Sequence, residues 1–361
     1  MGLIDPRVQK QADILVDYSI KFKKGDNVVI VADFAAKPLV SEIYRLLIKK
    51  GAGEVKLHFD SNDLAEIYFK NASEKQLKHY PRIDDYEIKN VDCYIRIISS
   101  TNTRGLTAID ARKVSLRQKI TKPINDYRAE NTRWVITRFP TEAQAQEADM
   151  SLSDYENFVF NAINKVDWVK KFKEQEKLRN LIDKTNKVHI VGPQTDLYLS
   201  IKGRKAVNAA GEFNMPDGEV FTSVVEDSTN GYITYTYPAL YLGREFHSVR
   251  LEFKNGKVVS VTAAKNEADL KKILDIDSSA RYIGELGIGN NYQIKKFTKD
   301  ILFDEKIGGS IHIALGKGYK ETLSKNESAL HWDMIKDLRS EGGLWFDNKL
   351  VQKNGKWIMK Y

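Results

Sequence analysis

The feature that most constrains the fold lies near the N-terminus, where two apolar strands flank an amphipathic helix. Residues 27–32 form a continuous apolar run, which is typical of a strand buried on both faces. A helical pattern follows over residues 37–50, and residues 54–59 indicate a second strand. A strand, a helix and a strand in this order form a β-α-β unit. We therefore predict a parallel sheet with flanking helices in the first half of the chain.

The turn after the first strand, residues 32–36, contains no glycine. It matches neither a dinucleotide-binding fingerprint nor a phosphate-binding loop, so a nucleotide site is not expected there. Two more strands are predicted at residues 92–99 and 132–138, with helices between them. The first half is thus predicted to be an α/β scaffold whose sequence carries no recognisable chemistry.

The second half has a different pattern. Residues 151–184 predict a long charged helix that leads into it, with Ser153 and Asp154 as its cap. Short strands then follow at 188–191, 197–201, 232–237, 248–253 and 258–263. Asn-Gly pairs at 255–256 and 354–355 are strong hairpin signals. Because 361 residues exceed one ordinary core, we predict an α/β domain over 1–184 and a β-rich α+β catalytic domain over 185–361.

Composition excludes several classes of protein. With 42% hydrophobic and 29% charged residues and no apolar run near membrane-spanning length, the chain is predicted to be globular, with no membrane partner. The net charge of +8 does not imply a nucleic-acid partner, because lysines alternate with acids, as in residues 170–177. Cys93 is the single cysteine and the N-terminus lacks a signal-peptide pattern, so a cytoplasmic location is expected.

The residues with chemical potential gather in the second half. His312 lies in an apolar strand, and His331 and Asp333 are two residues apart, so they share one face if extended. Glu219 follows a Pro-Asp-Gly turn, and Glu285 lies among glycines and apolar residues. Two imidazoles and three carboxylates suit a hydrolytic site with one or two divalent metals. A buried structural histidine or a carboxylate at a sheet edge would give the same patterns, so spacing alone leaves both readings open.

Four longer segments carry a family resemblance. They are N-M-P-D-G-E-V-F-T at 214–222, G-E-L-G-I-G at 284–289, D-E-K-I-G-G-S-I-H-I-A-L-G at 304–316 and S-A-L-H-W-D-M at 328–334. Together they resemble the metallo-aminopeptidase family of aminopeptidase T and aminopeptidase S, a group of thermophilic metalloproteases. The resemblance covers the second half closely and the first half loosely, and the segment between Tyr319 and Ser328 looks shortened.

The resemblance implies roles for particular residues. Glu219, Glu285, His312, His331 and Asp333 would be metal ligands, with Glu285 bridging two metals. Tyr319 would have a catalytic role, seven residues after His312, where a phenol can donate a hydrogen bond to an oxyanion. Glu305 lies in a matched segment, and its role as ligand, neighbour of the ligands or structural residue stays open.

The resemblance further implies a dimeric cytoplasmic exopeptidase that removes N-terminal residues from peptides with two divalent metal ions. Ligands without cysteine favour zinc, cobalt or manganese. Two alternatives remain. One is a metal-dependent hydrolase of another small amide or ester. The other is a non-catalytic peptide-binding protein that kept the fold, although the complete set of five ligand positions argues against it.

Overall fold

The computed structural model describes residues 5–359, which form parts of two compact units. The first unit extends to Val166 and also includes Gly211–Pro216, and the second begins at Asp167. The sequence suggested a boundary at residue 184, but the units divide earlier. The reason lies in α9 (Trp168–Ile182), where Gln175 donates hydrogen bonds to the carbonyl oxygens of Ala209 and Glu219. This helix therefore packs with the second unit.

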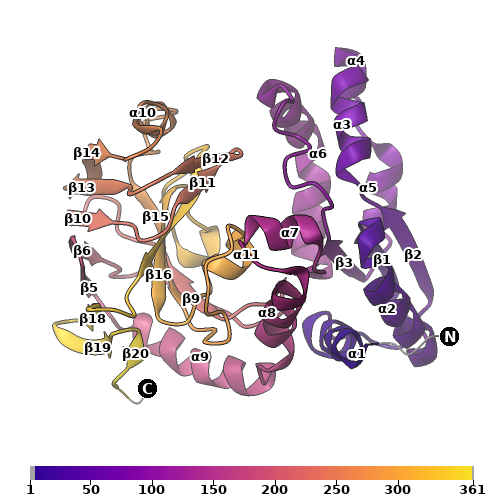
Figure 1. Ribbon diagram of the computed structural model, residues 1–361, viewed down its shortest axis with the longest axis horizontal. Helices are drawn as coiled ribbons and strands as arrows, with labels where there is room; N and C mark the ends of the chain where they lie inside the picture. The colour runs from indigo at the N-terminus through magenta and orange to yellow at the C-terminus, as the bar shows by residue number, and fades with distance from the viewer. Residues whose placement is uncertain (1–4, 360–361) are drawn as a thin grey trace. The chain divides into compact units, whose positions relative to one another are not determined.

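The first unit contains a five-stranded parallel sheet of order β2-β1-β3-β4-β8 (Figure 1). Its strands are β1 (Asn27–Ala32), β2 (Glu54–Phe59), β3 (Cys93–Ile98), β4 (Arg133–Arg138) and β8 (Asn214–Met215). Its helices are α1 (Pro6–Asp13), α2 (Lys37–Lys50), α3 (Asn62–Asn71), α4 (Glu74–Leu77), α5 (Arg82–Ile88), α6 (Ala111–Asn131), α7 (Glu142–Glu147) and α8 (Leu152–Asn164). A π-helical turn (Ile14–Ser19) and a 3-10 turn (Phe34–Ala36) complete it. The predicted α/β fold is confirmed.

Helix α2 forms where its apolar spacing predicts it. Leu39, Ile43 and Leu47 recur on one face and are fully buried. Gly51 ends the helix in the left-handed region, with φ of 83°. The β-α-β unit of the sequence is therefore present with its expected connections.

The long helix predicted over residues 151–184 is two helices. Ser151, rather than Ser153, caps α8 by accepting a hydrogen bond from the backbone of Asp154. Asp167 then caps α9 by accepting one from the backbone of Lys170. The second cap starts a new helix three residues after the first one ends, which the charge pattern alone did not indicate.

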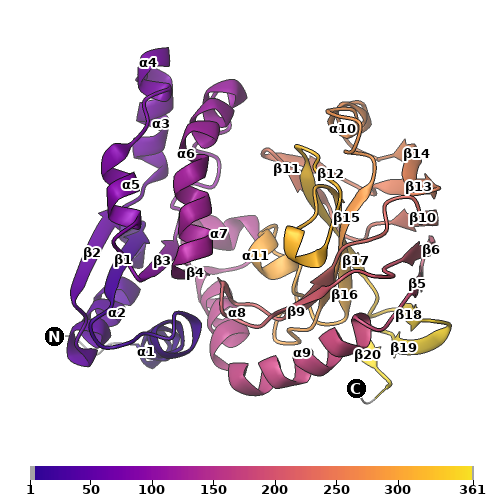
Figure 2. The same ribbon diagram turned by 180° about the vertical axis from the view of Figure 1, so that it is seen from behind.

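The second unit consists mainly of two antiparallel sheets (Figure 2). The larger has the order β14-β13-β10-β6-β5-β18-β19-β20. Its strands are β5 (Lys187–Gly192), β6 (Thr195–Ser200), β10 (Asn230–Thr234), β13 (Arg250–Lys254), β14 (Lys257–Thr262), β18 (Gly343–Phe346), β19 (Lys349–Lys353) and β20 (Lys356–Trp357). Apolar residues of both sheets, among them Leu197, Leu251 and Ile313, belong to one buried core cluster. The predicted β-rich second domain is confirmed.

The smaller sheet, of order β17-β16-β15-β9-β7, holds the predicted ligands. Its strands are β7 (Ala206–Ala209), β9 (Glu219–Thr222), β15 (Ile283–Gly289), β16 (Ser310–Gly316) and β17 (His331–Asp337). The hairpin β11 (Ala239–Tyr241) and β12 (Arg244–Phe246), the helices α10 (Glu267–Leu274) and α11 (Ile301–Asp304), and a 3-10 turn (Lys320–Thr322) lie in the connections. Every residue of β15 and β16 is buried. Across residues 5–359, no helix has the length and apolarity needed to cross a membrane.

Candidate metal centre

Four neighbouring strands bring the five predicted ligands together. Glu219 opens β9, Glu285 lies on β15 and His312 lies at the middle of β16. His331 and Asp333 lie on the edge strand β17, two residues apart as predicted. The ladders place His312 opposite Gly287, and Asp333 opposite Ala314. Residues distant in sequence therefore converge because the strands are adjacent.

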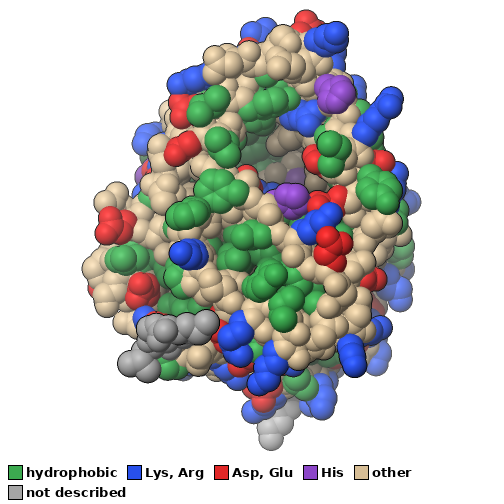
Figure 3. All heavy atoms as spheres, turned by 90° about the vertical axis from the view of Figure 1, so that its right-hand side faces the viewer, with side chains coloured by type: hydrophobic (Ala, Val, Ile, Leu, Met, Phe, Trp, Pro, Cys, Tyr) green, Lys and Arg blue, Asp and Glu red, His purple; other side chains and the backbone are tan. Residues whose placement is uncertain are grey.

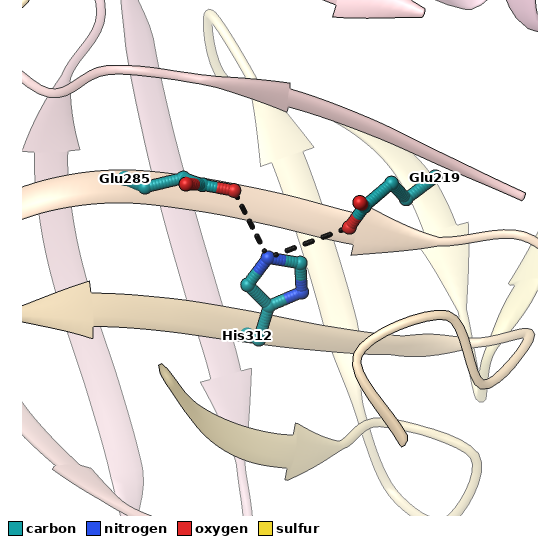
Figure 4. Close-up of side chains that lie close together, drawn as sticks. All are labelled: Glu219, Glu285 and His312. Carbon is teal, nitrogen blue, oxygen red and sulfur yellow. Dashed lines mark hydrogen bonds and ion pairs between the residues drawn. The ribbon is translucent and has the colours of Figure 1, made fainter. Parts of the chain in front are cut away.

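A first group of possible ligands consists of Glu219, Glu285 and His312 (Figure 4). The Nε2 atom of His312 lies 3.1 Å from Oε1 of Glu285 and 3.5 Å from Oε2 of Glu219. All three side chains are buried. One imidazole nitrogen thus lies between two carboxylates that enter from strands on the same sheet.

A second group consists of Glu285, His331 and Asp333. The Nε2 atom of His331 lies 3.4 Å from Oδ2 of Asp333 and 3.9 Å from Oε2 of Glu285. Glu285 consequently offers Oε1 to the first group and Oε2 to the second. This is the arrangement that a carboxylate shared by two cations requires.

Both imidazoles are oriented by backbone carbonyl groups. Nδ1 of His312 is 3.1 Å from the carbonyl oxygen of Glu305, and Nδ1 of His331 is 2.7 Å from that of Lys317. A carbonyl oxygen can only accept, so each Nδ1 carries a proton and donates it. Each Nε2 is thereby turned toward the carboxylates, and histidines that bind metals are typically held in this way.

A glycine makes room for the first imidazole. A Cβ atom added at Gly287 would lie 1.9 Å from Cε1 and 2.1 Å from Nε2 of His312. The ring therefore lies directly against the backbone of β15. Glycines surround Glu285 in the sequence, but their pattern does not single out Gly287 as necessary for His312.

Lys306 is a site residue that the sequence analysis missed. Its side chain is fully buried, and its ammonium group forms an ion pair with Glu305 and lies 3.8 Å from Oε1 of Glu219. Burial disfavours its charge, but the charges of Glu305 and Glu219 outweigh burial and raise the pKa of Lys306. The available signal was a lysine at the start of an apolar and glycine-rich segment, directly after two acidic residues.

Burial and crowding control the ionisation of the ligands. Burial raises the pKa of Glu219 well above its usual range and also raises that of Glu285. Burial would lower the pKa of His312, but its hydrogen bond to Glu285 and the charge of Glu219 raise that pKa to about 10. Burial would also lower the pKa of His331, but its hydrogen bond to Asp333 and the charge of Asp333 raise that pKa to about 9. The carboxylates thus stabilise positively charged groups that lie between them.

The same cluster contains oxygen atoms that lack hydrogen-bond partners among the described residues. Oε2 of Glu219 and Oε2 of Glu285 are buried and accept no hydrogen bond. A buried carboxylate oxygen without a donor is costly, and a cation removes that cost. These oxygens, together with the two Nε2 atoms, match the oxygen and nitrogen ligands that divalent transition metals prefer. The residues present therefore fit bound divalent metal ions.

Tyr319 lies at the border of the cluster. Its ring centroid is 5.5 Å from that of His331 and 5.4 Å from that of Phe221, and about half of the residue is exposed. Partial burial and the charges of Glu285 and Asp333 raise its pKa, so the phenol stays protonated and can donate a hydrogen bond. Its position beside a predicted ligand is compatible with contact to a substrate.

Glu305 contacts both Lys306 and the candidate ligands. Its side chain pairs with Lys306, while its backbone carbonyl accepts the proton of His312 Nδ1. A carboxylate oxygen of Glu305 also lies within 4.8 Å of ligand atoms of His312 and Asp333. The residue thus orients one ligand and contributes charge to the others.

Carboxylates and imidazoles gathered in two groups around one shared glutamate are typical of a metal-dependent hydrolase. The comparison with known families is more specific. Residues 4–357 match the thermophilic metalloprotease family (M29), so the chain belongs to this family. The resemblance inferred from the four segments is confirmed, and the family implies a divalent metal.

Similar proteins cover the whole chain. Aminopeptidase AmpS of Bacillus subtilis (strain 168) is 26% identical over 99% of this chain and 100% of its own length. Aminopeptidase T of Thermus thermophilus is 24% identical over 99% of this chain and 100% of its own. A solved structure of wild-type AmpT from Thermus thermophilus superimposes with a TM-score of 0.86 at 22% identity, covering 99% of this chain and 100% of that chain, which shows a shared fold. The family match and the names of the relatives bear out the prediction of a metal-dependent aminopeptidase.

The contact of His312 with Gly287 gives a first testable expectation. Gly287→Ala places a methyl group where the imidazole lies, so His312 must move and metal binding should fall. Metal content per chain, measured by mass spectrometry after gel filtration, checks this. Gly105→Ala is the control, because its added Cβ has ordinary contacts, 3.4 Å from Cβ of Asn62. Full metal content in Gly287→Ala would contradict the role of this glycine.

Proposed function

We propose that this chain is an aminopeptidase that uses two divalent metal ions, one in each ligand group. The observation that carries the proposal is the position of Glu285, which offers one carboxylate oxygen to each group. Glu219 and His312 complete the first group, and His331 and Asp333 complete the second. The mixture of carboxylates and imidazoles without cysteine supports zinc, cobalt or manganese.

Each residue has a distinct proposed task. When bound, paired divalent metals lower the pKa of water and polarise the scissile carbonyl group. Tyr319 donates a hydrogen bond from its hydroxyl to the oxygen that becomes negatively charged in the transition state. Lys306 stays outside the substrate's reach because it is fully buried, and it holds the carboxylates of Glu305 and Glu219 in place. Glu305 accordingly orients His312 and Lys306.

Peptides are the proposed substrates, supported by the family and by the names of the relatives. A cytoplasmic location is also proposed. Cys93 is free and buried, and a single cysteine forms no internal disulfide, which suits a reducing compartment.

The metal proposal has a direct test. The purified protein should bind about two divalent ions per chain, the number that a shared carboxylate serves. A chelator should abolish hydrolysis of leucine p-nitroanilide, and zinc, cobalt or manganese should restore it. Glu285→Gln removes the shared charge, so metal content and activity should fall together. Less than one ion per chain, with activity that survives the chelator, would refute the proposal, as would cleavage of simple esters without cleavage of any peptide.

Tyr319 is tested by a change that keeps its ring. Tyr319→Phe should lower kcat by roughly 10²–10³, the scale for one oxyanion donor, while KM changes little. Metal content should stay near that of the parent protein because the hydroxyl is not a proposed ligand. Loss of metal would instead make the phenol a ligand, and unchanged kcat would leave the ring with a packing role.

A homodimer is the proposed assembly, and the first unit offers a surface for it. On the side where β2, α3 and α5 lie, hydrophobic side chains gather at the surface (Figure 3). In the first unit, Phe34, Leu57, Phe59, Ile83 and Tyr86 are each more than half exposed, and Phe34 and Phe59 form an edge-to-face pair. β2 is also an edge strand of its sheet. Exposed apolar side chains along an unpaired edge are typical of an interaction surface.

Light scattering at micromolar concentration should give twice the chain mass of 41.3 kDa. Phe59→Lys should shift the protein toward the monomer, because it places a charge in the apolar surface. Val259→Lys is the matched control, since this exposed residue lies on β14 of the second unit. A monomer for the unmodified chain would count against the dimer, and a dimer unaffected by Phe59→Lys would place its interface elsewhere.

A further inference from the structure

A cavity beside the second ligand group has no role in the proposals above. It has a volume of about 210 Å³ and lies between β11 with the turn that follows it, helix α11 and the edge strand β17. His331 and Asp333 form part of its wall, so it is continuous with the candidate metal centre. All of these elements belong to the second unit.

The rest of the wall is mainly apolar. Leu240 and Tyr241 come from β11, Ile301 from α11 and Ile335 from β17. The carboxyl group of Asp304 also lines the cavity, but the residue is 1% exposed. Its Oδ1 accepts hydrogen bonds from the backbone N–H and the hydroxyl of Thr298, at 2.7 and 2.9 Å. Apart from His331, Asp333, Asp304 and the indole N–H of Trp332, the wall therefore offers mainly apolar contact to a ligand.

The outer edge of β17 supplies an independent observation. The carbonyl oxygen of Ile335 accepts a hydrogen bond from the backbone N–H of Thr236, on the side away from β16. In an antiparallel pair alternate residues turn their N–H and C=O groups outward. The backbone of Asp333, two residues earlier, therefore also faces outward, and within residues 5–359 it has no hydrogen-bond partner there.

An open strand edge of this kind can pair with an extended peptide. The strand β11 contacts β17 but forms its ladder with β12, and within residues 5–359 it makes no backbone hydrogen bond to Asp333. A peptide aligned on Asp333 would bring its backbone next to a candidate metal ligand and its side chains next to the cavity. The two features thus belong to one binding site.

We propose that this cavity binds the side chain of the N-terminal residue of the substrate and selects large apolar side chains such as those of leucine, methionine and phenylalanine. The proposal rests on the aminopeptidase function. The volume holds about seven water-sized groups, which is enough for these side chains. Lysine and arginine are disfavoured because the wall beyond the candidate ligands is mainly apolar, and Oδ1 of its one further acidic side chain, Asp304, is already hydrogen-bonded to Thr298.

The test fills the cavity from two sides. Leu240→Trp and Ile301→Trp add bulk at residues that are partly or largely exposed, so each variant has room to fold. The assay compares the p-nitroanilides of alanine, leucine, phenylalanine and lysine with the metal-loaded protein. The parent protein should favour leucine and phenylalanine over alanine by about tenfold or more in kcat/KM. Both variants should lose about tenfold on leucine and phenylalanine and change little on alanine.

Val259→Trp is the matched control, because Val259 is exposed on β14 outside the cavity wall. It should keep the preference of the parent protein. Metal content and melting temperature are measured for each variant, so that loss of the fold or the metal is recognised. Calorimetric binding of free phenylalanine to the metal-loaded protein gives a second readout, and the filled variants should weaken it about tenfold.

Several outcomes would overturn the proposal. An equal loss of kcat/KM on all four substrates would show that the cavity does not recognise the side chain of the N-terminal residue. A change confined to the second residue of leucyl dipeptides would assign the cavity to that residue instead. If the parent protein hydrolyses none of these compounds, the aminopeptidase function fails. In that case, the cavity would still be supported as a binding site if phenylalanine binds and Leu240→Trp weakens the binding. It would be refuted if phenylalanine does not bind or if Leu240→Trp leaves its binding unchanged.

Discussion

Carboxylates buried side by side are the constraint on which the second unit depends. Two like charges about 4 Å apart repel by about 4 kcal/mol at an effective dielectric constant near 20. Glu219, Glu285, Glu305 and Asp333 share this small volume, and Lys306 supplies one permanent positive charge among them. Protons on His312 and His331 balance part of the remaining negative charge, and divalent cations can take their place. The same crowding that raises the pKa values of His312 and His331 therefore makes the cluster a strong attractor for divalent metals.

The sheet makes this crowding possible because it fixes the ligands before any ion arrives. His312 can lie between two carboxylates because Gly287, its partner across the ladder, has no side chain. Its Nδ1 proton is held by a carbonyl group from the turn before its own strand. Gln175 of α9 binds the carbonyl oxygen of Glu219 and anchors β9 from the opposite side. Orientation thus comes from backbone contacts, which do not depend on the ionisation of the ligands.

Local patterns allowed much of the fold to be predicted. The apolar run at residues 27–32 and the Asn-Gly turns specify their structures through neighbours in sequence, and they appear where expected. The prediction of one helix over 151–184 was wrong because Asp167 caps a second helix within the continuous charge pattern. The unit boundary differed because it depends on where α9 packs, which involves residues far away in sequence.

For the same reason, the candidate site could be predicted from the sequence only in part. The convergence of His331 and Asp333 follows from the two-residue period of a strand, but that of Glu219 with Glu285 needs the order of the strands. Only the family resemblance supplied that information from sequence. Lys306 gave a weak signal because lysine is usually solvated, and its burial follows from carboxylates that arrive from other strands.

The segment after Tyr319 shows how a rigid cluster can coexist with an accessible tyrosine. Arg204 donates a hydrogen bond to the carbonyl oxygen of Leu323 and forms an ion pair with Glu226. The other oxygen of Glu226 accepts from the backbone N–H of Lys325. The buried side chain of Arg204 therefore holds this short segment in place, while Tyr319 stays half exposed. The candidate ligands are fixed by the sheet and the phenol by a tethered turn, so under the proposed function a substrate can meet the hydroxyl without any displacement of the strands that carry these ligands.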